Sequence, residues 1–258
     1  MNVYAFQTDI TWEDKVANYE NIHTLGERFK PQPGGLIVLP EMFATGFSMQ
    51  TAVTQEPEDG PSFTFLSELA QRTQCHVVGG LAIDQGNTRP TNEAFTIDPG
   101  GQRLHRYAKL HPFSMGKESQ HYQAGSEITQ FELPGGLRCC IFICYDLRFP
   151  EIFRQAMESE KPPHLFIVIA NWPNMRTRHW TRLLEARAIE NLAYVVGVNR
   201  TGSDPYLSYD GASAIIDPLG KTLCLADHKE QVLQAHVEAH VVDQWRETFP
   251  ALKDRRLV

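Results

Sequence analysis

The sequence has little of what a secreted, membrane-bound or nucleic-acid-binding protein needs. Its five cysteines are an odd number and two are adjacent, so they do not form a disulfide framework. No segment reaches the length of an apolar transmembrane helix, and the first residues lack the basic and apolar regions of a signal peptide. Acidic residues (31) outnumber lysine and arginine (24), which argues against a nucleic-acid-binding surface. These absences predict a cytoplasmic protein that binds neither membranes nor nucleic acid.

Metal-binding patterns are also missing. The ten histidines show no tight metal-ligand spacing, and none shares a segment with a cysteine at the spacing of a zinc site. We therefore expect neither a metal nor another cofactor. Apolar residues make up 42% of the 258 residues and charged residues 21%, which is ordinary for a globular protein. The length fits one large domain or two small ones.

Helical and strand patterns alternate along most of the chain. Within residues 13–29, apolar side chains at Val16, Tyr19, Ile22 and Leu25 fall on one face of a helix. Between such segments lie short runs that are wholly apolar or alternate with period two. The order predicts an α/β domain with a mixed sheet. The expected helices are Glu13–Phe29, Ser62–Gln74, Glu151–Ser159, Thr177–Asn191 and Val241–Thr248. The expected strands are Val3–Thr8, Leu36–Leu39, His76–Ile83, Asn92–Ile97, Arg103–Ala108, Ile128–Leu133, Leu137–Ile143, His164–Ala170, Ala193–Asn199, Ala212–Ile216, Thr222–Leu225 and Val232–Val237.

Cys144 differs from the other cysteines because it ends an apolar run. Residues 139–144 (CCIFIC) suit a strand buried on both faces, charge begins at Asp146, and a helical stretch follows Pro150. In open α/β sheets, reactive groups collect at the carboxyl ends of strands, and a thiol on a strand-to-helix turn is held rigidly. Cys144 is therefore a candidate nucleophile, whereas the other four cysteines are expected to pack as small apolar residues.

Two more strand ends carry charged residues. Glu41 follows the short buried strand Leu36–Leu39 among apolar neighbours, where loss of hydration suits a general base. Lys109 follows the expected strand Arg103–Ala108. Beside a carboxylate and a thiol, its ammonium would stay charged and stabilise an oxyanion. A carboxylate bound by backbone N–H groups and a solvated lysine are the ordinary alternatives for these two residues.

Residues near Lys109 offer competing assignments. Lys117 is a second candidate for the lysine role, although it lacks a position at a strand end. His105 and His111 flank Lys109, and either of them could form a Cys–His pair with Cys144. No second feature of the sequence supports such a pair.

Three sequence blocks surround the three strand-end candidates: LPEMF around Glu41, YAKLHPF around Lys109 and CYDLRFPE around Cys144. In order and spacing they resemble the signature blocks of the nitrilase superfamily of carbon–nitrogen hydrolases. Three further blocks are similar to later segments of that family: ANWP (170–173), ARAIEN (186–191) and DGASAIIDPLG (210–220). The resemblance covers essentially the whole chain, and within the superfamily it is strongest to the short bacterial ω-amidase-like branch.

This resemblance implies an architecture. A nitrilase-like domain is a four-layer α-β-β-α sandwich with mixed sheets, here formed by residues 1–258 as a single carbon–nitrogen hydrolase domain. The family resemblance also implies a homodimer or a higher homo-oligomer. The pairing helices would be Glu151–Ser159 and Thr177–Asn191, and the tail from about residue 241 would lie at the subunit interface.

The resemblance also implies a chemistry. A primary amide would be hydrolysed through a thioester on Cys144, with Glu41 as the base. Lys109 and the backbone N–H of Tyr145 would hold the oxyanion, and Glu118, in ESQHYQAG, would be a second carboxylate of the active site. The expected substrate is a small 2-oxo-acid ω-amide such as 2-oxoglutaramate or 2-oxosuccinamate. An aliphatic amidase, an N-carbamoyl amidase or a nitrilase would use the same residues, and a non-catalytic binding protein on this fold is a further alternative.

A substrate carboxylate needs a local cation in a chain of net charge −7. The segment ANWPNMRTRHW follows an expected strand end and offers Arg176 and Arg178, either of which could grip a carboxylate with two hydrogen bonds. Trp172 and Phe43 are the expected apolar walls of the pocket. Solvated surface groups or interface contacts are the alternatives for both arginines.

Overall fold

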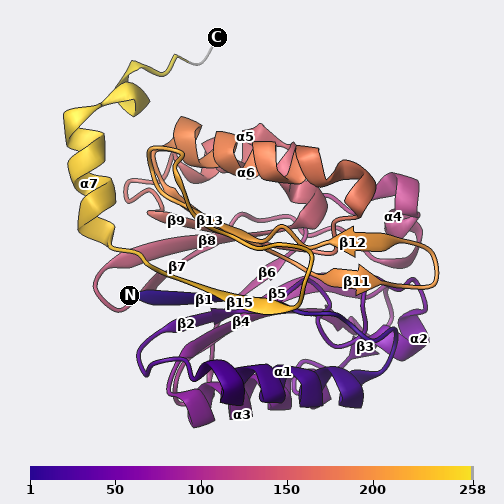
Figure 1. The fold of residues 1–258 in the computed structure, drawn as a ribbon. Coiled ribbons are helices and arrows are strands. Elements are labelled where there is room, and N and C mark those ends of the chain that lie inside the picture. Colours follow the sequence, from indigo (N-terminus) through magenta and orange to yellow (C-terminus); the bar gives the residue numbers. More distant parts are fainter. Residues whose placement is uncertain (257–258) are drawn as a thin grey trace.

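Two β-sheets pack face to face at the centre of the molecule. The computed structural model describes residues 1–256, and Figure 1 shows the sheets stacked between two helical layers. The first sheet has the strand order β15-β1-β2-β4-β5-β6, with the short β3 paired to β4, and the second has the order β14-β13-β10-β9-β8-β7. The strands of the first sheet are β1 (Asn2–Gln7), β2 (Leu36–Val38), β3 (Gln55–Glu56), β4 (His76–Ile83), β5 (Thr91–Ile97), β6 (Arg103–Ala108) and β15 (Gln231–His236). Those of the second are β7 (Gln130–Leu133), β8 (Leu137–Ile143), β9 (Leu165–Ala170), β10 (Tyr194–Asn199), β13 (Ala214–Ile216) and β14 (Thr222–Leu225), while β11 (Thr201–Ser203) and β12 (Ser208–Asp210) form a separate hairpin.

Alternating side chains of each strand enter different layers of the core. In β1, Val3 and Ala5 join the core between the sheets, whereas Tyr4 and Phe6 pack under the helices on the outer face. This division follows from the two-residue period of a strand. Because both faces of such a strand are covered, its sequence is almost wholly apolar, as in β8 and β9.

Helices cover both outer faces. Figure 1 shows α1 (Lys15–Phe29) and α3 (Pro61–Thr73) on the outside of the first sheet, and α5 (Pro150–Ala156) and α6 (Thr177–Asn191) on the outside of the second. The result is the expected α-β-β-α order of layers. The remaining helices are α2 (Thr51–Thr54), α4 (Glu118–His121) and α7 (Ala239–Thr248), the last of which runs along the side of the sandwich and away from it.

The expected helices and strands are all present, with ends that differ by at most three residues. Four features were not predicted from the sequence: α2, α4, β3 and the β11–β12 hairpin, whose elements have only two to four residues each. Elements this short carry too little hydrophobic periodicity to be detected. Within residues 1–256, no helix is long and apolar enough to cross a membrane.

Candidate active site

Cys144 lies where β8 ends and a short 3₁₀-helix (Cys144–Arg148) begins. Its φ of 48° is in the left-handed region, so the chain turns sharply at this residue. The carboxylate of Asp146 supports the turn by accepting hydrogen bonds from the backbone N–H of Ile143 (3.1 Å) and the hydroxyl of Tyr107 (2.8 Å). The Cys144 thiol is partly exposed and donates to the backbone oxygen of Asn171 at 3.8 Å. The turn therefore presents a fixed thiol, as predicted.

A buried group of charges lies beside this thiol. The Lys109 ammonium donates to Glu41 Oε1 at 2.8 Å and to the two oxygens of Glu118 at 3.1 and 2.9 Å. The three side chains are at most 1% exposed. Two carboxyl groups and one ammonium held out of contact with solvent are a costly arrangement that is typical of functional sites. The structure thus brings Glu41, Lys109 and Glu118 together as the sequence analysis predicted.

Strand ends and a close backbone approach position these groups. Glu41 lies three residues beyond β2, and Lys109 immediately follows β6. A Cβ atom at Gly80 would lie 2.6 Å from the Cα of Glu41, so only glycine allows β4 to pass this close to the carboxylate. Glu118 is the first residue of α4, and its Oε2 also accepts the backbone N–H of Phe113 at 2.5 Å.

Burial and mutual charge shift the protonation of the group. Burial by itself lowers the pKa of Lys109, but the charges of Glu118 and Glu41 outweigh it, so this pKa lies above its ordinary value. Burial raises the pKa of Glu118, and the charge of Glu41 adds to that effect. Burial, followed by the charge of Glu41, also raises the pKa of the Cys144 thiol well above its ordinary value. The resting site therefore holds a neutral thiol beside a charged ammonium, and attack by sulfur requires a base.

Asn171 connects the thiol to this group and was not among the predicted site residues. It lies just beyond β9 and donates its backbone N–H to Glu41 Oε2 at 2.8 Å and its side-chain Nδ2 to the backbone oxygen of Glu41 at 2.5 Å. Since its own backbone oxygen accepts from Cys144, one residue contacts both the candidate base and the candidate nucleophile. The signal that could have found it is the one used for Cys144, a polar residue at the end of a buried strand.

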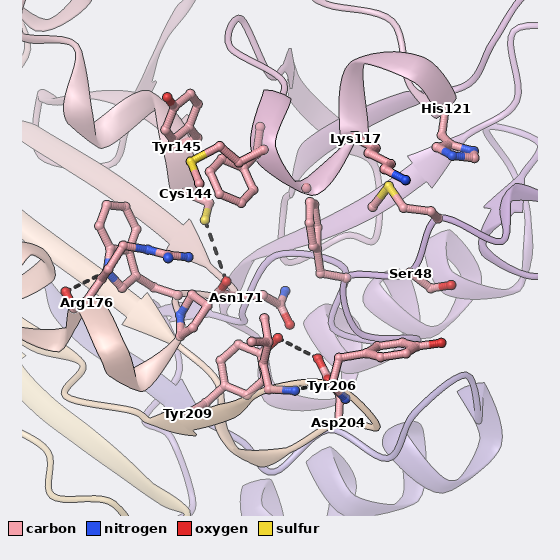
Figure 2. Close-up of a pocket in the computed structure, with 18 of the residues that line it drawn as sticks. Ser48, Lys117, His121, Cys144, Tyr145, Asn171, Arg176, Asp204, Tyr206 and Tyr209 are labelled. Atoms are coloured by element: carbon pink, nitrogen blue, oxygen red, sulfur yellow. Dashed lines mark hydrogen bonds between the residues drawn. The ribbon is translucent and has the colours of Figure 1, made fainter.

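A cavity of about 600 Å³ opens above Cys144. Figure 2 shows the thiol pointing into it, with Arg176 on one side, Lys117 and His121 on the other, and Tyr209 across the cavity. Most of the lining is aromatic or otherwise apolar, as in small-molecule sites. The aromatic residues on the walls are Trp12, Phe47, Phe113, Tyr145, Trp172, Tyr206 and Tyr209.

Two of the four predicted pocket residues lie on the cavity and two do not. Trp172 and Arg176 line it. Arg178 is exposed on the first turn of α6 and is not among the lining residues, because its side chain leaves the helix on the solvent side. Phe43 is fully buried and packs against Phe65 under the outer helices, since its position after the Glu41 turn directs it away from the second sheet. Phe47, which the sequence analysis missed, is an apolar wall instead.

The competing assignments find less support. Lys117 lines the cavity but is exposed and lies outside the buried charge group. The Nδ1 of His111 is 2.8 Å from Asp146 Oδ1, and His105 stacks on Phe131, so neither imidazole lines the cavity beside Cys144. Within residues 1–256, no group of three or more histidine, cysteine, aspartate or glutamate side chains is arranged to hold a metal ion.

Comparisons with known proteins find relatives that match the chain over nearly its full length. The chain is 35% identical over 256 residues to the omega-amidase YafV of Escherichia coli K12, a match that covers 98% of this chain and 96% of the relative. It is 32% identical over 255 residues to the 2-oxoglutaramate amidase of Bacillus subtilis, covering 98% and 97%. Among solved structures, a carbon–nitrogen hydrolase superfamily protein of Xanthomonas campestris, described with an arsenic adduct in its active site, superposes with a TM-score of 0.93. It is 33% identical, and the match covers 100% of this chain and 98% of that one.

The family model for carbon–nitrogen hydrolases matches residues 3–247. This span includes both sheets, the buried charge group and the thiol at the end of β8. The full-length relatives and the matching fold lead to the same assignment, and the chain belongs to the carbon–nitrogen hydrolase family.

Proposed function

We propose that this protein is an ω-amidase that hydrolyses the terminal primary amide of a small 2-oxo acid, such as 2-oxoglutaramate or 2-oxosuccinamate. The observation that carries the proposal is the buried Glu41–Lys109–Glu118 group beside the Cys144 thiol on the floor of a cavity. The relatives named omega-amidase and 2-oxoglutaramate amidase support the choice of amide.

The proposed reaction starts with the neutral thiol. Glu41 takes the proton of Cys144 as sulfur bonds to the amide carbon, and the carbonyl oxygen becomes an oxyanion held by the Lys109 ammonium and the backbone N–H of Tyr145. Glu41 then passes the proton to nitrogen, the C–N bond breaks, and ammonia leaves a thioester. Water gives a proton to Glu41 and attacks the thioester. The carboxylic acid departs, and the thiol of Cys144 is restored.

Two arginines on one side of the cavity supply the positive charge that a substrate carboxylate needs. The guanidinium of Arg176 lies 5.5 Å from the ring centre of Phe113, and that of Arg148 lies 4.8 Å from the ring centre of Trp172. Burial and the nearby charge of Arg176 lower the pKa of Arg148, so the two cations destabilise each other. Within the described residues 1–256, neither forms an ion pair with a carboxylate. A substrate carboxylate bound between them would relieve this repulsion.

Replacement of one arginine tests the proposal, and Arg178 provides a matched control. Loss of a charge-assisted hydrogen bond in Arg176→Ala should raise KM for 2-oxosuccinamate by about 10- to 100-fold. It should change KM for a neutral aliphatic amide of similar length by less than about threefold, and Arg178→Ala should affect neither. Equal losses on both substrates would reject carboxylate recognition by Arg176.

A substrate panel separates the related activities. Ammonia release should be fastest from 2-oxo-acid ω-amides and slower from L-glutamine, a nitrile or a carbamoyl amino acid. If a nitrile is hydrolysed faster than every amide, the proposed activity would be that of a nitrilase instead of an amidase, since the proposed catalytic residues serve both reactions. Absence of turnover on the whole panel together with a thiol inert to iodoacetamide would favour a binding protein.

We also propose that the protein is a cytoplasmic homodimer or higher homo-oligomer. Ile189 of α6 is 54% exposed, and Leu219 is 57% exposed in the turn between β13 and β14, where its neighbour Gly220 lies against Ile189. Exposed apolar side chains on neighbouring elements are what a subunit interface buries. The helix α7, including the tail from about residue 241, would lie at this interface. Light scattering at micromolar concentration should give at least twice the mass of 29.3 kDa, and a monomer mass would contradict the proposal.

A further inference from the structure

Asn92 is buried at the start of β5, directly behind the proposed base and lysine. Its side chain is 1% exposed. Its backbone oxygen accepts the N–H of Lys109 at 2.9 Å, which extends the pairing of β5 with β6 by one bond. The backbone of Asn92 therefore holds the lysine at the end of its strand.

The side chain of Asn92 makes a second set of contacts. One Nδ2 hydrogen goes to Glu41 Oε1 at 2.8 Å and the other to Glu118 Oε1 at 2.9 Å. Both of these oxygens also accept from the Lys109 ammonium, at 2.8 and 3.1 Å. The amide and the ammonium thus bridge the same pair of carboxylate oxygens from two directions.

This arrangement leaves the amide no alternative orientation. Both neighbouring atoms are acceptors, so Nδ2 must face them, and the Oδ1 of Asn92 is left buried without a hydrogen-bond partner among residues 1–256. A buried polar atom without a partner is unfavourable and is typical of positions kept for function. A residue chosen for packing alone would avoid this cost.

We propose that Asn92 is a positioning residue of the hydrolysis, which holds Glu41 and Glu118 at a fixed spacing and so sets the direction in which the Lys109 ammonium points toward the oxyanion. An ammonium has three hydrogens. If the amide donors are removed, Lys109 becomes the main donor to both carboxylates and turns further toward them. The two carboxylates also lose a neutral group that keeps their charges separated. This inference rests on the roles proposed above for Glu41, Lys109 and Cys144.

The test uses Asn92→Asp, which keeps the shape and removes the donors, and Asn92→Ser, which keeps one donor. In Asn92→Asp, kcat for 2-oxosuccinamate should fall by about 100-fold, while KM should stay within about threefold because the cavity walls are unchanged. The kcat of Asn92→Ser should lie between that of Asn92→Asp and that of the unmodified enzyme. Thr96→Val is the matched control. Thr96 is fully buried on the same strand, its hydroxyl has no partner among residues 1–256, and its replacement should leave kcat unchanged.

A substrate-independent measurement separates this role from a structural one. The rate at which iodoacetamide alkylates Cys144 should be followed from about pH 5 to about pH 9. Because the Asn92 donor lowers the pKa of the Glu118 carboxyl, its replacement by serine should move the acidic limb of this profile to higher pH. A variant that is merely less stable would lose amplitude without moving the limb.

The possible outcomes are distinct. If the unmodified enzyme is alkylated but releases no ammonia from 2-oxo-acid amides, the proposed substrate fails and the alkylation profile still tests Asn92. If Glu41→Gln leaves alkylation unchanged, the proposed base fails. An unmoved acidic limb, together with a kcat within about threefold of normal in folded Asn92→Ser, would overturn the positioning role.

Discussion

Glu118→Gln should remove most of the activity and little of the stability. Every group around the Glu118 carboxylate is a donor: Lys109 to both oxygens, Asn92 to Oε1 and the backbone N–H of Phe113 to Oε2. A glutamine side chain has one acceptor and one donor, so whichever way it turns, its NH₂ group faces another donor. The ammonium of Lys109 then loses one of its two anchors and the orientation needed at the oxyanion. We expect kcat to fall by about 100-fold or more.

The stability change is small because two effects oppose each other. Burial raises the pKa of Glu118, so the folded protein disfavours its ionised form, and a neutral side chain removes that penalty. The donor–donor contact that replaces it costs about 1–3 kcal/mol. The net change should lie within about 2 kcal/mol, or roughly 5 °C in melting temperature for a chain of this length.

The sign of the pH dependence provides a second check. As pH rises above 4.5, the ordinary pKa of a glutamate, the Glu118 carboxyl loses its proton in the unfolded chain before it does so in the folded one. The unfolded state then binds fewer protons, and this group's contribution to stability declines as pH rises from that value to the folded pKa. The decline should be absent in Glu118→Gln.

Ammonia release measures the loss of kcat in Glu118→Gln, and thermal unfolding measures the change in its stability. The control is Glu132→Gln, since Glu132 is an exposed glutamate on β7. The reasoning is refuted if folded Glu118→Gln keeps kcat within about threefold, or if its melting temperature falls by much more than about 10 °C.

Three further changes test other parts of the structure. Cys144→Ala should abolish ammonia release in a folded protein, whereas Cys139→Ala, in the core, should cost about 1 kcal/mol by urea unfolding and spare turnover; the reverse pattern would exclude Cys144 as the nucleophile. Burial lowers the pKa of His105 from 6.5 to about 4, so the unfolded chain takes up the proton first and stability declines by up to about 3 kcal/mol as pH falls through this window. In His105→Phe, the melting temperature should depend less on pH between 6.5 and about 4, and an unchanged slope would contradict this. Asp146→Asn should lower kcat by about 10- to 100-fold and stability by about 2 kcal/mol, since Asp146 binds the turn at Cys144 to the loop after Lys109; normal kinetics would show that the turn holds without it.

The strand-end positions marked three candidates for the site, and the family resemblance then favoured them over the ordinary alternatives. Glu41, Lys109 and Cys144 each follow a strand, and in the structure all three lie at one edge of the stacked sheets. Parallel strands place their carboxyl ends together, so charged or nucleophilic residues at those ends meet even when they are far apart in the chain. Asn171 also follows a strand, but it was not selected from the sequence because a neutral amide has no acid–base chemistry of its own.

The other members needed topology that the sequence does not contain. Glu118 lies on a four-residue helix between strands, and only the family resemblance identified it. Asn92 lies at the beginning of a strand, where reactive groups are not expected. It reaches the site because β5 is antiparallel to both β4 and β6, so its start lies at the edge where those strands end. Strand direction is set by pairing, which the hydrophobic pattern does not specify.

The position of the cavity wall was misjudged for a related reason. Phe43 follows Glu41 closely in the sequence, but the turn at Met42, with a φ of 44°, sends it into the core beneath the outer helices. Arg148 was not selected because it lies among the charged residues after Cys144. Its place on the cavity depends on the 3₁₀-helix that turns it toward Trp172.

The seam between the two sheets explains how the buried charge group and the Cys144 thiol come to share one site. Glu41 and Lys109 follow strands of the first sheet, and the Cys144 thiol follows a strand of the second. Asn171, from the second sheet, donates two hydrogen bonds across the seam to Glu41, at 2.8 and 2.5 Å, and these fix the Glu41 carboxylate relative to the thiol. Because the apolar core between the sheets is close-packed, they cannot slide without breaking these bonds. The packing energy of the sandwich thus offsets the cost of keeping two carboxylates and an ammonium out of water, and holds them within reach of the sulfur.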